Sequence, residues 1–184
     1  MRKLFSFNMV TLDGFFEGPN RDIDWHKVDE EFNEFAVEQT SAVGALLFGR
    51  VTYELMASYW PTPAAMESDP QVAALMNSLP KVVFSRTLPS ADWENSRVVR
   101  DHAQEEIQKL KAQPGRDMAI FGSANLISTI MDVIDEHRLL VNPVLLREGT
   151  PLFKHAGEPL ELNLVNVRRF NSGNILVSYQ PVRS

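Results

Sequence analysis

The sequence contains no cysteine among its 184 residues. The chain therefore has no disulfide bond, no thiolate nucleophile and no cysteine-ligated zinc or iron–sulfur site. It has only nine glycines and eleven prolines, and its net charge is −6. Neither the glycine and proline content nor the charge approaches that of collagen-like or disordered chains, so we expect a folded chain with one sizeable core.

Basic patches and long apolar runs are also missing. The 18 basic residues are outnumbered by 24 acidic ones, so we expect no nucleic-acid partner. No window approaches the ~18 apolar residues of a membrane-spanning helix. The start of the chain is interrupted by Ser6 and Asn8 and lacks a cleavage site, which favours a first strand over a signal peptide. These features predict a cytoplasmic protein without a membrane partner.

Familiar catalytic signatures are absent too. The sequence has no Gly-x-Ser-x-Gly, no Walker loop and no Gly-x-Gly-x-x-Gly. The histidines at positions 26, 102, 137 and 155 lack the spacing of metal ligands, so we expect no metal site. His102 and His137 are predicted as surface residues near the start of a helix and of a strand.

What is present is an alternation of two patterns along the chain. Short apolar runs typical of strands alternate with segments whose apolar residues recur every three or four positions, as in amphipathic helices. The predicted strands cover residues 3–12, 45–48, 81–85, 97–100, 118–121 and 138–146, and the predicted helices lie near 28–36, 51–60, 69–76, 102–112 and 126–134. Asp69 is the predicted N-cap of the third helix, with Pro70 at its first position.

The end of the chain has a different pattern. Leu160, Leu162 and Leu164 alternate with polar residues, and a second alternating segment follows a turn at 171–174, as in a β-hairpin. The whole order predicts one α/β domain over residues 1–184. We expect a mixed, mostly parallel sheet with helices on both faces and a C-terminal antiparallel hairpin.

Three predicted strands end in turns suited to a phosphate group. Gly122-Ser123 follows a buried strand and opens a helix, whose free N–H groups and positive dipole end favour an anion. Gly49 is followed by Arg50, and Ser85 by Arg86, and a guanidinium can hold a phosphate with two hydrogen bonds. At each turn, an ordinary capped turn or a solvated arginine is the alternative.

Five motifs in a fixed order resemble a known family. They are Thr-Leu-Asp-Gly at 11–14, Leu-Phe-Gly-Arg-Val-Thr-Tyr-Glu at 47–54, Phe-Gly-Ser-Ala at 121–124, Asp-Glu at 135–136 and Gly-Thr-Pro-Leu-Phe at 149–153. This order resembles the dihydrofolate-reductase-like family formed around the C-terminal reductase domain of bacterial riboflavin-biosynthesis deaminase-reductases. The resemblance runs from about residue 3 to 181. Because no zinc-deaminase signature is present, the chain resembles a stand-alone reductase domain.

The resemblance implies a dihydrofolate-reductase-like fold, NADPH as hydride donor and a homodimer. By similarity, the cofactor-binding residues fall into four groups along the chain. They are Thr11 beside the nicotinamide; Gly49, Arg50, Val51 and Thr52 at the phosphates; Ser85 and Arg86 at the adenosine ribose and its 2′-phosphate; and Gly122, Ser123, Ala124 and Asn125 at the pyrophosphate.

Asp13 is the first candidate for the catalytic residue that orients the substrate or supplies a proton, and a turn aspartate before Gly14 is the alternative. Asp29 and Glu30, on a helix whose acids mostly face water, are the other candidates, together with a bound water. The chain departs from the family pattern at Arg147, where relatives commonly have glycine, and at Ser123, where many have a second glycine.

The sequence therefore predicts an NADPH-dependent reductase that transfers a hydride to a C=N or C=O carbon of a small polar substrate. A pyrimidine ribosylamine, a dihydropterin and an unrelated carbonyl compound all fit this class. The alternatives are a nucleotide-binding dimeric module with little or no turnover and a purely structural, dimer-forming protein.

Overall fold

The computed structural model describes residues 1–154 and 158–183. Its centre is an eight-stranded sheet with the order β5-β4-β3-β6-β1-β7-β10-β9. The strands from β5 to β7 in this order run parallel, and β10 and β9 complete the sheet in antiparallel pairs. The strands are β1 (Leu4–Thr11), β3 (Ala45–Gly49), β4 (Lys81–Phe84), β5 (Ser96–Val99), β6 (Met118–Ile120), β7 (Glu136–Asn142), β9 (Leu162–Arg169) and β10 (Ile175–Pro181). The predicted mixed sheet with its C-terminal hairpin is confirmed.

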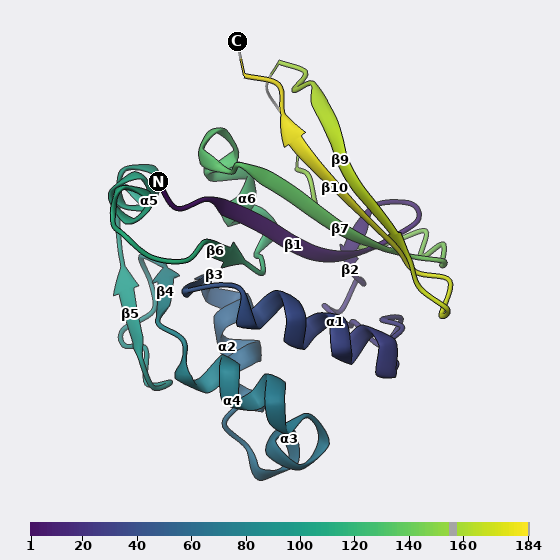
Figure 1. Ribbon diagram of the computed structural model, residues 1–184, viewed down its shortest axis with the longest axis horizontal. Helices are drawn as coiled ribbons and strands as arrows, with labels where there is room; N and C mark the ends of the chain where they lie inside the picture. Colours follow the sequence, from purple (N-terminus) through teal and green to yellow (C-terminus); the bar gives the residue numbers. More distant parts are fainter. Residues whose placement is uncertain (155–157, 184) are drawn as a thin grey trace.

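Helices cover both faces of this sheet, as Figure 1 shows. One face carries α1 (Glu30–Ser41), α2 (Arg50–Tyr59), α3 (Pro63–Ser68) and α4 (Pro70–Ser78), and the other carries α5 (Ala103–Ala112) and α6 (Ala124–Thr129). The fully buried strand β3 explains why both faces are covered, because its side chains alternate between two apolar clusters. Leu46 and Phe48 belong to the cluster beneath α2 and α4, and Leu47 to the cluster beneath α5 and α6.

Some predicted elements differ from the structure. The helix predicted over 126–134 is broken at Ile130, whose φ is −112°, and continues as a short 3₁₀ helix (Met131–Val133). Ile130 and Ile134 are nevertheless fully buried, so the apolar spacing arose from burial rather than from one helix. Asp69 is the N-cap of α4 and Pro70 its first residue, as predicted, but the Asp69 side chain makes no cap hydrogen bond. The strand predicted over 138–146 ends at Asn142, because Pro143 has no N–H group to continue the ladder.

A small second sheet was not predicted. It pairs β2 (Phe15–Glu17) with β8 (Thr150–Pro151) in antiparallel fashion, and it therefore joins the connection after β1 to the motif at 149–153. These strands are too short to produce an alternating pattern in the sequence. Within the ranges that the structure describes, no helix is both long and apolar enough to cross a membrane.

Candidate functional site

Strands β3 and β6 lie next to each other and end at one edge of the sheet, where a helix follows each strand. The Gly49 N–H donates a hydrogen bond of 3.1 Å to the Gly122 carbonyl. Helix α2 begins directly after Gly49 and α6 directly after Ser123, and neither N-cap residue makes a side-chain cap. We call Gly49, Thr52, Gly122 and Ser123 the glycine cradle. Here two helix starts present uncapped N–H groups and a positive dipole end, an arrangement that favours an anion.

The two glycines of the cradle are required by the packing of the protein itself. A Cβ at Gly49 would lie 2.5 Å from the Ser123 hydroxyl oxygen. Gly122 has a φ of +104°, and a Cβ there would lie 3.0 Å from both the ring of Phe16 and the hydroxyl of Thr52. Any side chain at Gly122 would therefore displace protein groups first. The glycine signal in the sequence reports close packing at this edge as well as room for a ligand.

Arg50 occupies the first position of α2, beside the cradle. Its guanidinium lies 3.1 Å from the carboxylate of Glu54 one turn along the helix, and both side chains are nearly half exposed. Such a surface pair contributes only about 0.3–0.5 kcal/mol. The Arg50 guanidinium can therefore exchange Glu54 for a bound phosphate at little cost. Of its helical neighbours, Val51 is half-buried and Thr52 is buried.

The turn after β4 lies at the same edge, because β4 runs parallel to β3. The Ser85 hydroxyl oxygen accepts hydrogen bonds from the backbone N–H groups of Thr87 and Leu88, at 3.2 and 3.0 Å, so it closes the turn. The Arg86 guanidinium pairs with Asp101 at 3.1 Å and is 81% exposed. This arginine is therefore free to reorient toward a ligand on the rim.

A lysine that the sequence analysis missed also reaches this edge. The Lys154 ammonium donates a hydrogen bond of 3.1 Å to the Asn125 side chain in the first turn of α6, next to buried Ala124. Lys154 directly follows the motif at 149–153, and its position after that motif was the available signal. The pairing places a positive charge at the first turn of α6.

Thr11 and Asp13 form a hydrogen-bonded knot at the end of β1. The buried Thr11 hydroxyl donates to an Asp13 carboxylate oxygen at 2.6 Å. The same carboxylate accepts the backbone N–H groups of Leu146 and Arg147 at 3.1 and 2.8 Å. These hydrogen bonds, first that from Thr11, lower the pKa of Asp13. An ionised carboxylate that accepts three donors is poorly suited to donate a proton at neutral pH.

The two departures from the family pattern, Arg147 and Ser123, lie at a turn and at a helix start. Arg147 keeps a left-handed conformation with a φ of +70°, which is the conformation that a glycine would adopt easily. The close backbone approach is made by Gly149, where a Cβ would overlap the carbonyl oxygen of Glu17. Ser123 stands at the N-cap of α6, although its side chain makes no capping bond.

The other candidate residues have contacts that belong to the fold itself. Asp29 caps α1, since its carboxylate accepts the Phe32 N–H at 2.9 Å, and Glu30 is exposed beside it. His137 was predicted on the surface and is buried in β7, where its Nδ1 lies 3.0 Å from the Ser6 hydroxyl. Burial lowers the pKa of His26 and of His137 to about 4.

His102 takes no part in the cradle. His102 is exposed at the N-cap of α5, near Glu105 at 3.1 Å, and His155 lies outside the described residues. Among the residues that the structure does describe, no three His, Asp or Glu side chains gather as metal ligands would.

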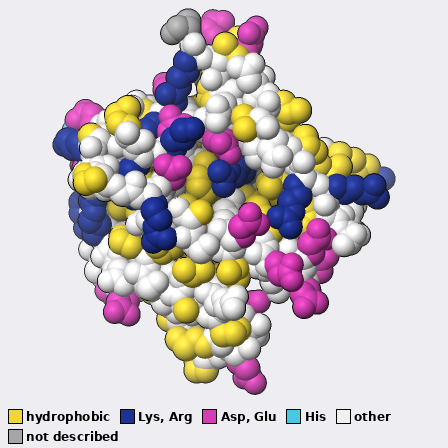
Figure 2. Space-filling view, viewed as in Figure 1, with side chains coloured by type: hydrophobic (Ala, Val, Ile, Leu, Met, Phe, Trp, Pro, Cys, Tyr) yellow, Lys and Arg dark blue, Asp and Glu magenta, His cyan; other side chains and the backbone are white. Residues whose placement is uncertain are grey.

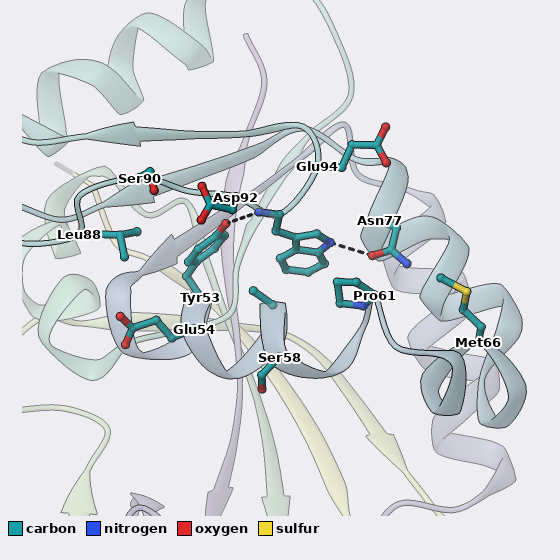
Figure 3. Close-up of a pocket in the computed structure, with 12 residues that line it drawn as sticks. Tyr53, Glu54, Ser58, Pro61, Met66, Asn77, Leu88, Ser90, Asp92 and Glu94 are labelled. Carbon is teal, nitrogen blue, oxygen red and sulfur yellow. Dashed lines mark hydrogen bonds between the residues drawn. The ribbon is translucent and has the colours of Figure 1, made fainter.

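A hollow of about 600 Å³ lies between α2 and the segment 88–94 (Figure 3). Its floor is held by two hydrogen bonds: the Tyr53 hydroxyl accepts the Trp93 backbone N–H, and the Trp93 indole donates to Asn77. The lining is acidic, with carboxylates from Glu54, Asp92 and Glu94. Because these carboxylates repel phosphate, this hollow does not serve the chemistry expected of the cradle.

Comparisons with known proteins agree with this architecture. The model of the RibD C-terminal domain family matches residues 2–176. The Bacillus subtilis protein YyaP, itself uncharacterized, is 36% identical over 174 residues, which cover 92% of this chain and 90% of YyaP. YyaP and the family model thus span nearly the same part of the chain.

Two solved structures have the same fold at low sequence identity. The deaminase and 5-amino-6-(5-phosphoribosylamino)uracil reductase of Thermotoga maritima superposes with a TM-score of 0.72 at 18% identity, over 98% of this chain and 57% of that protein. Dihydrofolate reductase from Enterococcus faecalis, complexed with NADP(H), superposes with a TM-score of 0.66 at 15% identity, over 97% and 96% of the two chains. The chain therefore has a dihydrofolate-reductase-like fold and belongs to the RibD C-terminal domain family.

Proposed function

We propose that this protein is an NADPH-dependent reductase that transfers a hydride to a C=N or C=O carbon of a small polar substrate. The observation that carries the proposal is the glycine cradle, where α2 and α6 begin without side-chain caps at the ends of neighbouring strands. Membership of a family named for a riboflavin-biosynthesis reductase supports the same reading.

The residues at this edge fit a dinucleotide phosphate. Its charges would meet the uncapped helix starts and two arginines whose ion pairs, with Glu54 and Asp101, are exposed and easily exchanged. In this assignment Arg50 and the cradle bind the phosphates, Arg86 and Ser85 the 2′-phosphate end, and Asn125 with Lys154 the far side of the cradle. When bound, NADPH supplies the hydride.

The protein's own groups orient the reaction and exclude water. The knot of Thr11 and Asp13 stands at the end of β1, so the substrate side of the site lies there. Asp13 stays ionised and accepts hydrogen bonds. Its role is therefore to hold the groups around it in position rather than to donate a proton to the substrate. The proposed substrates range from a pyrimidine ribosylamine to a dihydropterin. Two proteins of the same fold are named for reductases of these two classes.

The test of the activity is a titration with NADPH followed by turnover with each substrate class. A reductase binds NADPH saturably and consumes it steadily with one of the substrates. Saturable binding without consumption by any substrate would favour the nucleotide-binding module with little or no turnover. Absence of saturable binding would contradict both.

The outer strands of the sheet supply the surface for the expected homodimer. Apolar side chains gather over β9 and β10 at this edge (Figure 2), and Leu164 and Val167 are 57% and 54% exposed. An eight-residue edge strand with exposed apolar side chains is a surface on which another chain can pack. The partner that we propose is a second copy of the chain.

The oligomeric state tests this surface. Light scattering is expected to give twice the mass of the chain for the wild type and the mass of one chain for Val167→Asp. Leu55→Asp is the matched control, because Leu55 is 50% exposed on α2, away from β9. A monomeric wild type, or a dimer that survives Val167→Asp, would remove the surface from the proposal.

A further inference from the structure

A single aromatic ring from the small β2–β8 sheet faces the glycine cradle. Phe16 is the central residue of β2, and its ring is the group that a Cβ at Gly122 would meet, at 3.0 Å. The ring also packs against the apolar cluster that contains Leu152 and Val10. Whatever fixes β2 therefore fixes the covering of the cradle.

The beginning of β2 is fixed by the knot at the end of β1. The Phe15 N–H donates to the Thr11 hydroxyl oxygen at 2.9 Å, and that hydroxyl in turn donates to Asp13 at 2.6 Å. Because the hydroxyl gives its only proton to Asp13, its lone pairs remain available for the Phe15 N–H. The Asp13 carboxylate thereby sets the orientation of the group that holds β2.

The same carboxylate also holds the segment that leads into the partner strand β8. Asp13 accepts the N–H groups of Leu146 and Arg147, which lie four and three residues before the start of β8 at Thr150. The Leu152 N–H then donates to the Gly14 carbonyl at 3.2 Å, on the other side of the pair. One side chain thus connects both strands of the ribbon that carries Phe16.

We propose that Asp13 is a positioning residue that holds the β2–β8 ribbon, and with it the ring of Phe16, over the glycine cradle. The inference rests on the proposed function, because the ring of Phe16 covers a cofactor site only if the cradle binds NADPH. Asp13 acts on that site through Phe16 and does not contact the reacting atoms. Charge matters for this role, since a carboxylate accepts all three donors, whereas an amide places an NH₂ group against one of them.

Amide hydrogen exchange of the free protein, read residue by residue by NMR, tests the positioning without any cofactor. In Asp13→Asn, exchange is expected to rise about ten-fold at residues 15–17, at Thr150 and at Leu152, beyond the directly bonded amides of 146 and 147. Asp24→Asn, an exposed aspartate of the connection between β2 and α1, is the matched control and leaves these rates unchanged. A rise confined to 146 and 147 would overturn the inference.

A second pair of variants keeps the test decisive if Asp13→Asn folds poorly. Thr11→Val removes the hydroxyl that links Asp13 to Phe15 and is expected to raise exchange at 15–17 in the same way. Thr11→Ser keeps the hydroxyl and restores the wild-type rates. If Thr11→Ser also raises them, the methyl packing of Thr11 holds β2, and the carboxylate does not.

Cofactor affinity then tests whether Asp13 acts through Phe16. Asp13→Asn and Phe16→Leu are each expected to weaken NADPH three-fold to ten-fold, and the double variant to weaken it no further than the stronger single one. Additive losses would mean that Asp13 acts independently of the ring and would overturn the inference. A wild type that fails to bind NADPH would instead contradict the proposed function, and the exchange rates alone would decide the positioning.

Discussion

The two ends of β1 are each held by an aspartate, and the two aspartates have opposite surroundings. At the amino end, the Leu4 N–H donates to Asp135 at 2.8 Å, and Asp135 pairs with the buried Lys111 and with Arg183 at 2.6 and 3.1 Å. At the carboxyl end, the exposed Asp13 accepts a hydroxyl and two backbone N–H groups. The Asp135 carboxylate is thus paired with a buried lysine at the amino end of β1, whereas the Asp13 carboxylate lies at an exposed junction of loops at the carboxyl end.

The difference separates a buried ion pair from an exposed, hydrogen-bonded carboxylate along one strand. Asp135 compensates the charge of a lysine that is only 5% exposed, so its loss leaves a buried charge unpaired. Asp13 holds short loop segments through hydrogen bonds that water can replace. Both residues belong to the motifs that resemble the family, and only their contacts distinguish a core clamp from a residue of the proposed site.

The largest expected effect concerns the stability of the folded protein in acid. Ser6 of β1 contacts His137, and burial lowers the pKa of His137 and of His26 from 6.5 to about 4. Below pH 6.5 these two histidines therefore bind protons in the unfolded chain, whereas in the folded chain they stay neutral until the pH approaches 4. The free energy of unfolding should fall by about 4 kcal/mol between pH 6.5 and about 4.5.

Chemical denaturation across this pH range measures the effect. Replacing both histidines, His26→Gln with His137→Gln, should flatten the dependence, and His102→Gln, at an exposed histidine, is the matched control. An equally steep dependence without His26 and His137 would assign the acid sensitivity to other groups.

The next largest effect tests the amino end of β1. Asp135→Asn should lower the free energy of unfolding by about 3 kcal/mol at neutral pH, because Lys111 keeps its charge and its burial. The contact of Lys111 with the Val133 carbonyl, at 3.1 Å, does not supply the missing negative charge. Denaturation curves give the change, and NADPH titration of the folded variant should match the wild type. Reduced affinity without lost stability would reverse the distinction between the two ends.

Much of the fold could be predicted from local pattern. The fully apolar runs that became β3 and β6, each bounded by glycine, identify buried parallel strands, and the alternation around the turn at 171–174 identifies the hairpin. The short elements could not be predicted, because β2, β8 and α3 contain three, two and six residues and show no period. His137 was misplaced because a single polar residue gives no sign of which face of a strand it occupies.

The geometry of the candidate site was predictable where it depends on turns and not where it depends on distant partners. Gly49, Gly122 and Arg86 follow strands whose order along the chain brings their ends to one edge. The bonds from Asp13 to Leu146 and Arg147 span more than 130 residues and arise only from the packed fold. Lys154 carries no local signal of its own either, apart from following the motif at 149–153.

Paired titrations with NADPH and NADH test the central claim, that the carboxyl edge of the sheet is a site for a phosphorylated dinucleotide. The wild type should bind NADPH saturably and more tightly than NADH. Arg86→Ala should weaken NADPH about ten-fold and NADH much less, since a charged hydrogen bond contributes about 1.5–3 kcal/mol. Arg97→Ala, which removes an arginine from an exposed ion pair on β5, serves as control and should change neither affinity. Equal losses for both cofactors in Arg86→Ala, or no saturable binding by the wild type, would contradict the account.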